Sequence, residues 1–467
     1  MFKTKKKFLV AFLSLIVGAQ YSCKKDTTEP TDSTTTTQQM YSTGAKSITG
    51  DMIQTSDGGY LMVGTSYASN NVEGDIVAIK TDSRGVQQWS TLMGKPAGTG
   101  TGSLAGQTVK YDEEGVKVAE EADGSYTLAA NRTYVSYANS SSSGVRNQTK
   151  IVFYKLSATG TATTLDGVEL RSNSEFTDKI SDFKIDGSQY VLTGFTTDVS
   201  SNKPNDGNNG AYDLTDILAL VLDGSFNPIW FRGAYGFSGK DYGTSIQIMS
   251  NGYLVIGTNE EQLSNSTSGN LYSPRFITVL FEKSGGTPIN VSHFGDQGYE
   301  LEGGYSIYDA TNQLTTIVGN TTGSSVSDPG QLVVFQIDNS LSIQNPNPSN
   351  TNAFGFELIN PTPPSATSIN NTFKASSIAL IPNNGGFAIS STLSDNLGKD
   401  ICITKLANDF SLPATGWPHY YGTLGNTSQE LAGPVIPMVD ANGTVEYAYT
   451  GTFNANTSTS QIGWVLF

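Results

Sequence analysis

The sequence SITGDMIQTSDGGYLMVGTSYASNNVEGDIVAIKTDSRGVQQWSTLMG at residues 47–94 decides the fold, because it divides into four short strands joined by turns. The turn Asp57-Gly58-Gly59 separates two runs with alternating apolar residues, Met52–Thr55 and Tyr60–Thr65, as in a tight hairpin. A second hairpin follows, with one strand at Ile76–Lys80 and the next at Val86–Met93. The stretch therefore predicts one four-stranded antiparallel sheet.

Six looser copies of this stretch follow along the chain. Their first-hairpin turns are Asp123-Gly124, Asp186-Gly187, Asn251-Gly252, Thr311-Asn312, Asn384-Gly385 and Asn442-Gly443. Four strands per copy give sheets with too little core to stand alone, and packing the sheets radially supplies that core. The 50 glycines and the low share of charged residues, 15%, suit an all-β protein that is rich in turns.

The copies share a pattern in which DGGY, an apolar strand, D-apolar-K-x-D-x-x-G and W-x-x-x-x-G follow one another. This pattern resembles the repeats of bacterial β-propeller proteins, and the resemblance covers residues 38–467. It implies a seven-bladed β-propeller of four-stranded antiparallel blades. Copy five departs from the pattern, because its turn Thr311-Asn312 has no glycine. A solenoid of β-hairpins and two separate sandwiches are the alternative architectures.

The two ends of the repeat region predict how the ring closes. The last copy stops after its third strand, Gln461–Phe467, and the segment Gln38–Gly44 before the first copy looks like the tail of a repeat. We expect these segments to pair, so that an N-terminal strand completes the last blade. Closure of this kind removes free sheet edges.

The N-terminal residues predict an export signal. Lysines at 3 and 5–7 precede the apolar run Phe8–Val17, which is too short to span a bilayer as a mature helix. The sequence QYSCKKD at 20–26 resembles the start of a Gram-negative bacterial lipoprotein, which implies a signal peptide at 1–22, lipidation of Cys23 and an outer-membrane location on the periplasmic or cell-surface side. A secreted protein cleaved elsewhere is the alternative. Residues 23–37 have the composition of a flexible tether, and 38–467 would form the propeller.

Charge and loop lengths bear on function. The formal net charge of −15 disfavours nucleic acid and anionic lipid surfaces as partners. In a propeller the first-to-second and third-to-fourth turns lie on one face, the short-turn face, where the turns are short here. The second-to-third loops and the connections between copies lie on the opposite face, the long-loop face, and include 133–150, 196–216 and 258–275. Long loops on one face of a rigid scaffold favour function there.

The long-loop face would present tyrosine, amide, carboxylate and arginine side chains. Tyrosine rings stack on sugars or anchor protein contacts, while Asn and Asp form hydrogen bonds with hydroxyl groups. The candidate ligand-binding residues are Tyr67, Tyr134, Tyr137, Arg146, Asp206, Asn208, Tyr212, Asp213, Tyr272 and Arg275. They favour a non-catalytic envelope lipoprotein that binds a polysaccharide or a protein partner. An extracellular carbohydrate-active hydrolase or lyase, and a structural or assembly lipoprotein, are the alternatives.

Motifs for catalysis, metals and cofactors are not evident in the sequence. It has two histidines, no Gly-x-Ser-x-Gly elbow and no phosphate loop. Residues 206–216 could supply oxygen ligands to Ca²⁺ but lack the EF-hand spacing, so an ordinary polar loop is the preferred interpretation and no metal site is predicted. Related propeller repeats occur in quinoprotein dehydrogenases, yet no cofactor-ligand pattern is present here. The sequence leaves one catalytic alternative, a glycosidase whose pair of carboxylates comes from two different loops.

Residues that recur in several copies are interpreted as scaffold. Aspartates 75, 216 and 400 each precede a third strand and would form turn hydrogen bonds. Tryptophans 89, 230 and 417 lie on or near fourth strands and would pack between neighbouring sheets. Cys402 has the position of a small core residue.

Overall fold

A computed structural model describes residues 36–69, 72–100, 104–137, 144–172, 176–197, 215–235, 239–266, 269–295, 301–321, 330–344, 356–359, 372–394, 398–413, 415–421 and 429–467. The residues from Asp32 to Phe467 form one compact unit. In the described residues this unit is built from β-strands, without an α-helix.

The strands group into seven antiparallel sheets, the blades of a propeller. Blade one contains β2 (Lys46–Gln54), β3 (Tyr60–Tyr67), β4 (Asp75–Thr81) and β5 (Gln87–Met93). Blade two contains β6 (Gly98–Thr99), β7 (Thr108–Glu120), β8 (Tyr126–Tyr137), β9 (Val145–Leu156) and β10 (Val168–Glu169). Blade three contains β11 (Asp178–Asp186), β12 (Gln189–Thr196), β13 (Asp216–Leu222) and β14 (Pro228–Tyr235). Blade four contains β15 (Asp241–Ile248), β16 (Tyr253–Ser266), β17 (Gly269–Phe281) and β18 (Pro288–Phe294).

The remaining three blades follow the same order. Blade five contains β19 (Leu301–Asp309), β20 (Leu314–Thr321), β21 (Leu332–Asp338), β22 (Ile343–Gln344) and β23 (Glu357–Ile359). Blade six contains β24 (Thr372–Leu380), β25 (Phe387–Ser394), β26 (Lys399–Leu406) and β27 (His419–Tyr421). Blade seven contains β28 (Leu431–Val439), β29 (Val445–Phe453), β30 (Gln461–Leu466) and, from the other end of the chain, β1 (Thr37–Tyr41).

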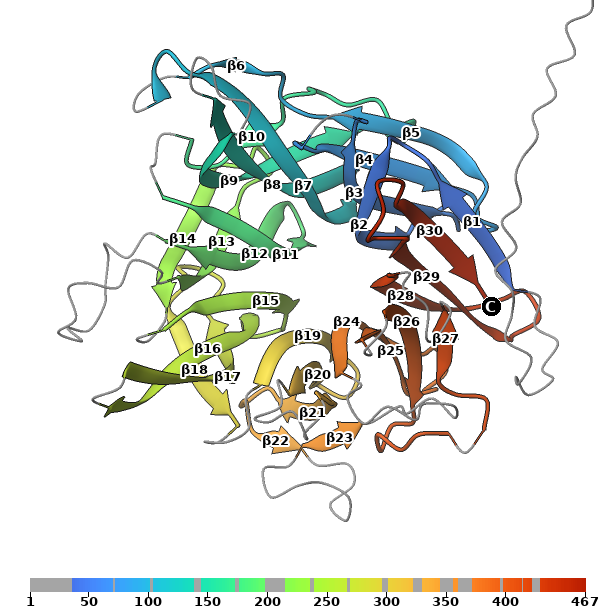
Figure 1. Cartoon of the computed structure of the whole chain (residues 1–467). Helices are drawn as coiled ribbons and strands as arrows, with labels where there is room; N and C mark the ends of the chain where they lie inside the picture. The colour runs from blue at the N-terminus through green and yellow to red at the C-terminus, as the bar shows by residue number, and fades with distance from the viewer. Residues whose placement is uncertain are drawn as a thin grey trace, which may run out of the picture. The chain divides into compact units, whose positions relative to one another are not determined.

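The seven-bladed propeller predicted from the repeats is confirmed, and so is its closure. Figure 1 shows the blades arranged in a ring with the first strand of each blade innermost. Strand β1 pairs antiparallel with β30, from Thr37 opposite Leu466 to Tyr41 opposite Ile462. The hydroxyl of Tyr41 also donates a hydrogen bond of 2.6 Å to the carbonyl oxygen of Gly85 in blade one. The N-terminal strand thus completes blade seven and contacts blade one.

Every inner strand carries a β-bulge in the same part of its register. The residues that follow these bulges are Asp51, Lys117, Asp182, Ser245, Tyr305, Ser377 and Val435. A bulge leaves backbone groups outside the sheet ladder, and here they bond to the preceding blade. The amide of Val118 donates to Asp51 at 3.2 Å, and that of Val435 donates to Ser377 at 3.0 Å. The bulges therefore connect neighbouring blades around the axis.

The hydrophobic core is divided among seven clusters, each shared by two neighbouring blades. Blades one and seven share the cluster that contains Met62, Ile462 and Trp464. Burying one aliphatic or aromatic side chain contributes ~1.5–3 kcal/mol, so the interfaces between blades supply most of the apolar stabilisation. This arrangement explains why one copy of the repeat cannot fold alone.

Two of the predicted tryptophans, on the outer strands β5 and β14, pack against glycines of the next blade. The Trp89 ring lies against Gly160, and the Trp230 ring against Gly286. In the closed ring, the buried ring of Trp464 lies against Gly85 in the same way. The glycines have positive φ angles of 81°, 65° and 78° in that order, which only glycine adopts without strain.

In the divergent turn of copy five, a residue other than glycine adopts the backbone conformation that the hairpin needs. Gln313 takes the left-handed conformation, with φ of 56°, that glycine supplies in the first copy. The aspartate side chain of Asp309 caps this turn by accepting hydrogen bonds from the amides of Thr311 at 2.9 Å and Asn312 at 3.2 Å. A side-chain cap of this kind stabilises a turn in which the usual glycine is missing.

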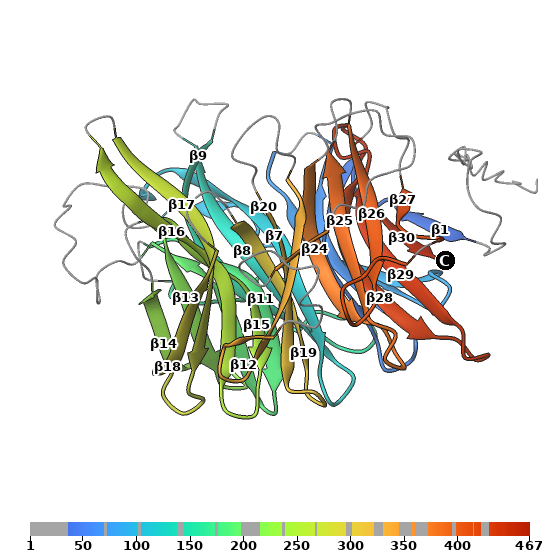
Figure 2. The ribbon, with the colours of Figure 1, turned by 90° about the horizontal axis from the view of Figure 1, so that it is seen from below.

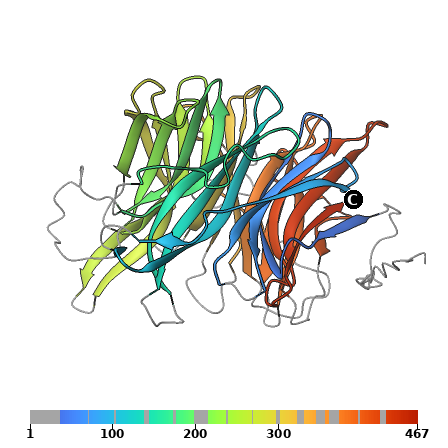
Figure 3. The same ribbon diagram turned by 90° about the horizontal axis from the view of Figure 1, so that it is seen from above.

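The two faces of the ring differ as the loop lengths predict, with two exceptions. Figure 2 shows the hairpin of β16 and β17, together with the start of β9, reaching away from the face of short turns, and Figure 3 shows the same blades from the opposite direction. The exceptions are the third-to-fourth connections at 157–167 in blade two and 407–418 in blade six. They are long because β10 and β27 span only two and three residues.

Candidate functional site

Three of the predicted binding residues meet where blades one and two adjoin on the long-loop face. Tyr67 ends β3, Tyr137 ends β8, and Arg146 lies at the start of β9. The Tyr137 hydroxyl donates a hydrogen bond to the Glu73 carboxylate. Lys110 lies over the Tyr137 ring, with its ammonium 4.7 Å from the ring centroid and 3.5 Å from Glu73. The extended strands of blade two therefore bring aromatic and charged groups from two blades together.

Arg146 is the exposed member of this group. Its Nη2 atom lies 2.5 Å from a carboxylate oxygen of Asp112, and 60% of its side chain is accessible to solvent. The other Asp112 oxygen accepts a hydrogen bond of 2.8 Å from the amide of Gly74. Burial, with the nearby carboxylates of Asp112 and Glu114, raises the pKa of Tyr67 to about 12. Tyr67 is therefore a neutral hydrogen-bond donor at physiological pH.

We name the group formed by Tyr67, Glu73, Lys110, Asp112, Tyr137 and Arg146 the junction cluster. It holds two cations, two carboxylates and two phenols, so its formal charges balance and it contains both donors and acceptors. The surface of the cluster can form hydrogen bonds with a neutral polar ligand without a net charge to oppose it.

Tyr134 belongs to a deeper network that links all four main strands of blade two. Its hydroxyl donates a hydrogen bond of 2.6 Å to Glu169 of β10. Glu169 also pairs with Arg132 of β8 at 3.0 Å, and Arg132 contacts Glu113 of β7 through its Nε atom. The Tyr154 hydroxyl, from β9, lies 3.0 Å from Glu113 and 2.8 Å from Arg132. The Tyr134 hydroxyl therefore forms a hydrogen bond within the protein, which is a structural role.

The charges of this network are almost fully enclosed. The side chains of Arg132 and Glu113 are 1% and 0% exposed. Burial raises the pKa of Glu113, and the guanidinium of Arg132 opposes that shift. A buried ion pair stabilises a fold only when additional hydrogen bonds satisfy both partners, and here Tyr154 and Glu169 supply them. Arg132 was not among the predicted site residues; the sequence signal was a charged residue inside an apolar strand.

The other predicted binding residues lie away from the junction cluster or outside the described residues. Arg275 is partly buried in blade four, and its backbone pairs with Asn259. Tyr272 pairs with Gln262 in the extended part of the same hairpin. The predicted residues Asp206, Asn208, Tyr212 and Asp213 lie outside the described part of the chain, as does Cys23.

Of the aspartates near third-strand starts, Asp75 and Asp216 are the first residues of β4 and β13, and Asp400 is the second residue of β26. Asp216 and Asp400 are buried, with 1% and 4% of their surface exposed, whereas Asp75 is partly exposed. Burial raises the pKa of Asp75. Their recurrent position at strand starts agrees with a scaffold role, which stays a prediction.

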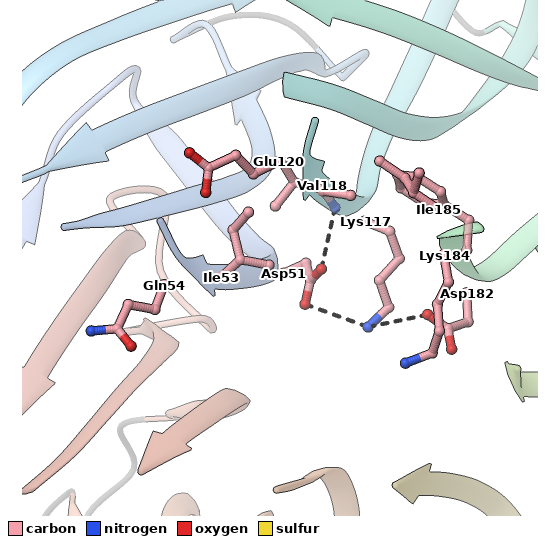
Figure 4. A pocket seen from close by; sticks show the side chains of 11 residues that line it. Asp51, Ile53, Gln54, Lys117, Val118, Glu120, Asp182, Lys184 and Ile185 are labelled. Carbon is pink, nitrogen blue, oxygen red and sulfur yellow. Dashed lines mark hydrogen bonds and ion pairs between the residues drawn. The ribbon is translucent and has the colours of Figure 1, made fainter. Parts of the chain in front are cut away.

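A second polar site lies on the axis of the ring. A cavity of about 410 Å³ is lined by the later parts of the inner strands β2, β7 and β11. Figure 4 shows Lys117 directed between Asp51 and Asp182 in this cavity. The Lys117 ammonium lies 3.4 Å from Asp51 and 3.7 Å from Asp182. Because these strand segments lead into the first-to-second turns, the cavity lies toward the short-turn face.

The charges of the axial cavity stabilise one another. Burial lowers the pKa of Lys117, but attraction by the Asp51 and Asp182 carboxylates outweighs it, so the net shift is upward. Burial raises the pKa of Asp51, and Lys117 opposes that shift. Lys117 therefore carries a positive charge at physiological pH. Sequence reasoning missed this group because its members are on three different blades.

Among the described residues, no group of three or more histidine, cysteine, aspartate or glutamate side chains is arranged to hold a metal ion. Within the same ranges, no helix has the length and apolar character needed to cross a membrane.

Comparison with known proteins gives fold-level likeness alone. No protein-family model matches the sequence, and no curated protein matches it. Among solved structures, the chain is similar to an α-L-arabinofuranosidase from Fusarium graminearum, at 10% identity over 90% of this chain and 93% of that one, with a TM-score of 0.37. It is also similar to Drosophila Plexin A solved with Semaphorin 1b, at 7% identity over 91% and 86% of the two chains, with a TM-score of 0.41. An endo-arabinase from Bacteroides thetaiotaomicron matches at 12% identity over 61% and 92%, with a TM-score of 0.30. Likenesses this distant carry no argument about activity.

Proposed function

We propose that this protein is a cell-envelope lipoprotein that binds a neutral polysaccharide through the long-loop face of its propeller, without cleaving it. The observation that carries the proposal is the junction cluster, in which residues of blades one and two present phenol, carboxylate and cationic groups at one surface. Tyr137 is fixed by Glu73 and Lys110, so little side-chain freedom is lost when a ligand binds.

The neutral ligand class follows from charge. The chain carries a formal net charge of −15, which repels polyanionic glycans. In the junction cluster each cation is balanced by a carboxylate. Lys110 lies 3.5 Å from Glu73, and Arg146 lies 2.5 Å from Asp112. Such paired groups form hydrogen bonds with sugar hydroxyls in both directions.

Binding is tested by titrating soluble neutral polysaccharides into the protein and following heat by calorimetry. Replacing Arg146 by Ala removes an exposed guanidinium, and we expect at least a tenfold rise in Kd. Arg84→Ala is the matched control, because Arg84 is exposed on the opposite face in the turn between β4 and β5. Equal affinity of the Arg146 and Arg84 variants would contradict the proposed surface.

The same titrations separate the alternatives. Release of new reducing ends during incubation would establish a hydrolase or lyase. Absence of polysaccharide binding, combined with recovery of one envelope protein by the native chain and not by the Arg146→Ala variant, would favour a protein partner on this face.

The lipid anchor is a separate part of the proposal, supported by the sequence around Cys23. Mass spectrometry of the mature N-terminus should find an acylated cysteine at position 23. The Cys23→Ser variant should move from the membrane fraction to the soluble fraction. Recovery of native protein that starts elsewhere and carries no lipid would replace this part with a secreted protein.

A further inference from the structure

The axial cavity is separate from the junction cluster. Its lining residues occupy the last half of β2, β7 and β11, whereas the junction cluster lies at the opposite ends of the blade strands. A volume of about 410 Å³ falls within the range of small-ligand sites, ~300–1,000 Å³. A ligand here would be small and would contact three blades at once.

At the polar centre of the cavity, one oxygen of each aspartate is bound to the protein backbone and the other faces Lys117. One oxygen of Asp51 accepts from the Val118 amide at 3.2 Å, and one oxygen of Asp182 accepts from the Ile246 amide at 2.9 Å. The remaining oxygen of each carboxylate lies toward Lys117, at 3.4 and 3.7 Å. These distances exceed the ~2.7–2.9 Å of a close charge-assisted hydrogen bond. The ammonium is therefore shared loosely by two fixed acceptors.

Lys117 is partly exposed to solvent, whereas Asp51 and Asp182 are largely buried. The side chain of Lys117 is 25% exposed, and those of Asp51 and Asp182 are 8% and 11% exposed. The Lys184 side chain lies beside Asp182 in Figure 4 and adds a second cation to the lining. A ligand that enters the cavity thus meets both donors and acceptors.

The lining around this centre is mixed, because Gln54, Glu120 and Lys184 contribute polar groups beside the apolar side chains. Ile53, Val118, Phe183 and Ile185 line the cavity together with the charged groups. An anion would meet two carboxylates, and a free cation would compete with Lys117 for them. A neutral ligand with adjacent hydroxyls avoids both conflicts, because one hydroxyl accepts from Lys117 while its neighbour donates to a carboxylate. The carbon face of a sugar ring can contact the apolar part of this lining, Ile53, Val118, Phe183 and Ile185.

We propose that the axial cavity of blades one to three binds a neutral polyhydroxylated ligand of monosaccharide size, with Asp51, Lys117 and Asp182 as its polar contacts. This site is independent of the polysaccharide-binding surface proposed above. The two sites lie toward opposite faces of the propeller, so each can be tested while the other is intact.

The first experiment locates binding without any substitution. D-glucose, D-galactose, D-mannose and L-arabinose are titrated separately into the full chain with labelled isoleucine δ1-methyl groups. One or more of them should shift the resonances of Ile53 and Ile185, which line the cavity. Ile229 and Ile289, exposed at 45% and 53% on outer strands, should keep their positions. No shift with any probe, or shifts confined to residues outside the cavity, would overturn the proposal.

A substitution then tests the polar contacts. Asp182→Asn keeps the shape and removes one anionic acceptor, so the Kd of the bound sugar should rise at least tenfold. Asp223→Asn is the control, because Asp223 lies in an exposed turn. An unchanged Kd in the folded Asp182→Asn variant would overturn the assignment; if that variant does not fold, methyl mapping of the native chain decides. Arg146→Ala should leave sugar binding at the cavity unchanged, which separates failure of this site from failure of the long-loop surface.

Discussion

Substituting alanine for two glycines of blade one separates backbone strain from packing between blades. Gly58 and Gly85 both have positive φ angles, 81° and 78°. A Cβ atom at Gly58 would meet no atom within 4 Å, whereas one at Gly85 would lie 2.3 Å from the Trp464 ring. The two substitutions therefore differ chiefly in the clash with blade seven.

The magnitudes follow from these two contributions. Alanine in the left-handed region costs ~1–2 kcal/mol, and this is the whole expected effect of Gly58→Ala. Gly85→Ala adds the cost of displacing a packed ring, ~1–3 kcal/mol, for a total of ~2–5 kcal/mol. Because the entropy of unfolding scales with chain length, a unit of this size loses roughly 1 °C of Tm per kcal/mol.

Differential scanning calorimetry on the two variants and the native protein measures the effect. We expect Gly85→Ala to lower Tm more than Gly58→Ala, by about 1–3 °C. In a Trp464→Phe background, where the ring is smaller, the additional loss caused by Gly85→Ala should shrink. Equal losses for the two alanine variants, or an effect of Gly85→Ala that does not depend on Trp464, would refute the proposed contact.

Three further predictions concern closure, buried charge and pH. A chain that begins at Ser42 lacks Thr37–Tyr41, so it exposes the edge of β30 and loses a buried tyrosine worth ~3–5 kcal/mol. We expect it to melt at lower temperature and to self-associate. Unchanged melting and a monomeric profile in size-exclusion light scattering would contradict the closure. Arg132→Met should lower the free energy of unfolding by ~3–5 kcal/mol, because it leaves buried carboxylates without their partner. Arg146→Met, at an exposed pair, should lower it by ~0–1 kcal/mol. Equal losses in urea denaturation would argue against the buried network. Partial burial disfavours the Asp57 carboxylate, but its hydrogen bond with Lys80 outweighs this and the pKa of Asp57 falls to about 2. The stabilisation from Asp57 is therefore present above about pH 4 and disappears as pH falls toward 2. Asp57→Asn should lower Tm at pH 6 and leave it unchanged at pH 2. An equal change in Tm at both pH values would contradict the lowered pKa of Asp57.

The fold could be predicted because each blade repeats one local pattern. Hairpin turns such as Asp57-Gly58-Gly59 and the apolar third strands are encoded over short distances. Closure was also predictable, since the third strand at Gln461–Phe467 had no successor and Gln38–Gly44 had no preceding partner. The turn of copy five needed the structure, because Gln313 adopts a conformation that sequence patterns assign to glycine or asparagine.

The candidate sites were predictable only in part. Tyr67, Tyr137 and Arg146 stood out as polar residues next to long loops, and the structure brings them together. The axial cavity was not predicted, because the pairing of Asp51 with Lys117 depends on the register between separate sheets. A signal was present nonetheless, since both residues occupy the same position after the bulge of their inner strands. Comparing the copies at that position would have identified the charged group.

The pairing of β1 with β30 sets the order in which the chain can fold. Tyr41 lies opposite Ile462, so the final blade needs residues from both extremes of the polypeptide. Contacts between distant positions form slowly, because a long loop must close before they contribute. During synthesis the N-terminal strand therefore stays without its partner until the last residues have emerged. Circular permutation should remove this delay: a chain that begins in blade one and carries Thr37–Tyr41 after Phe467 has a contiguous blade seven, and its refolding should be faster than that of the native connectivity.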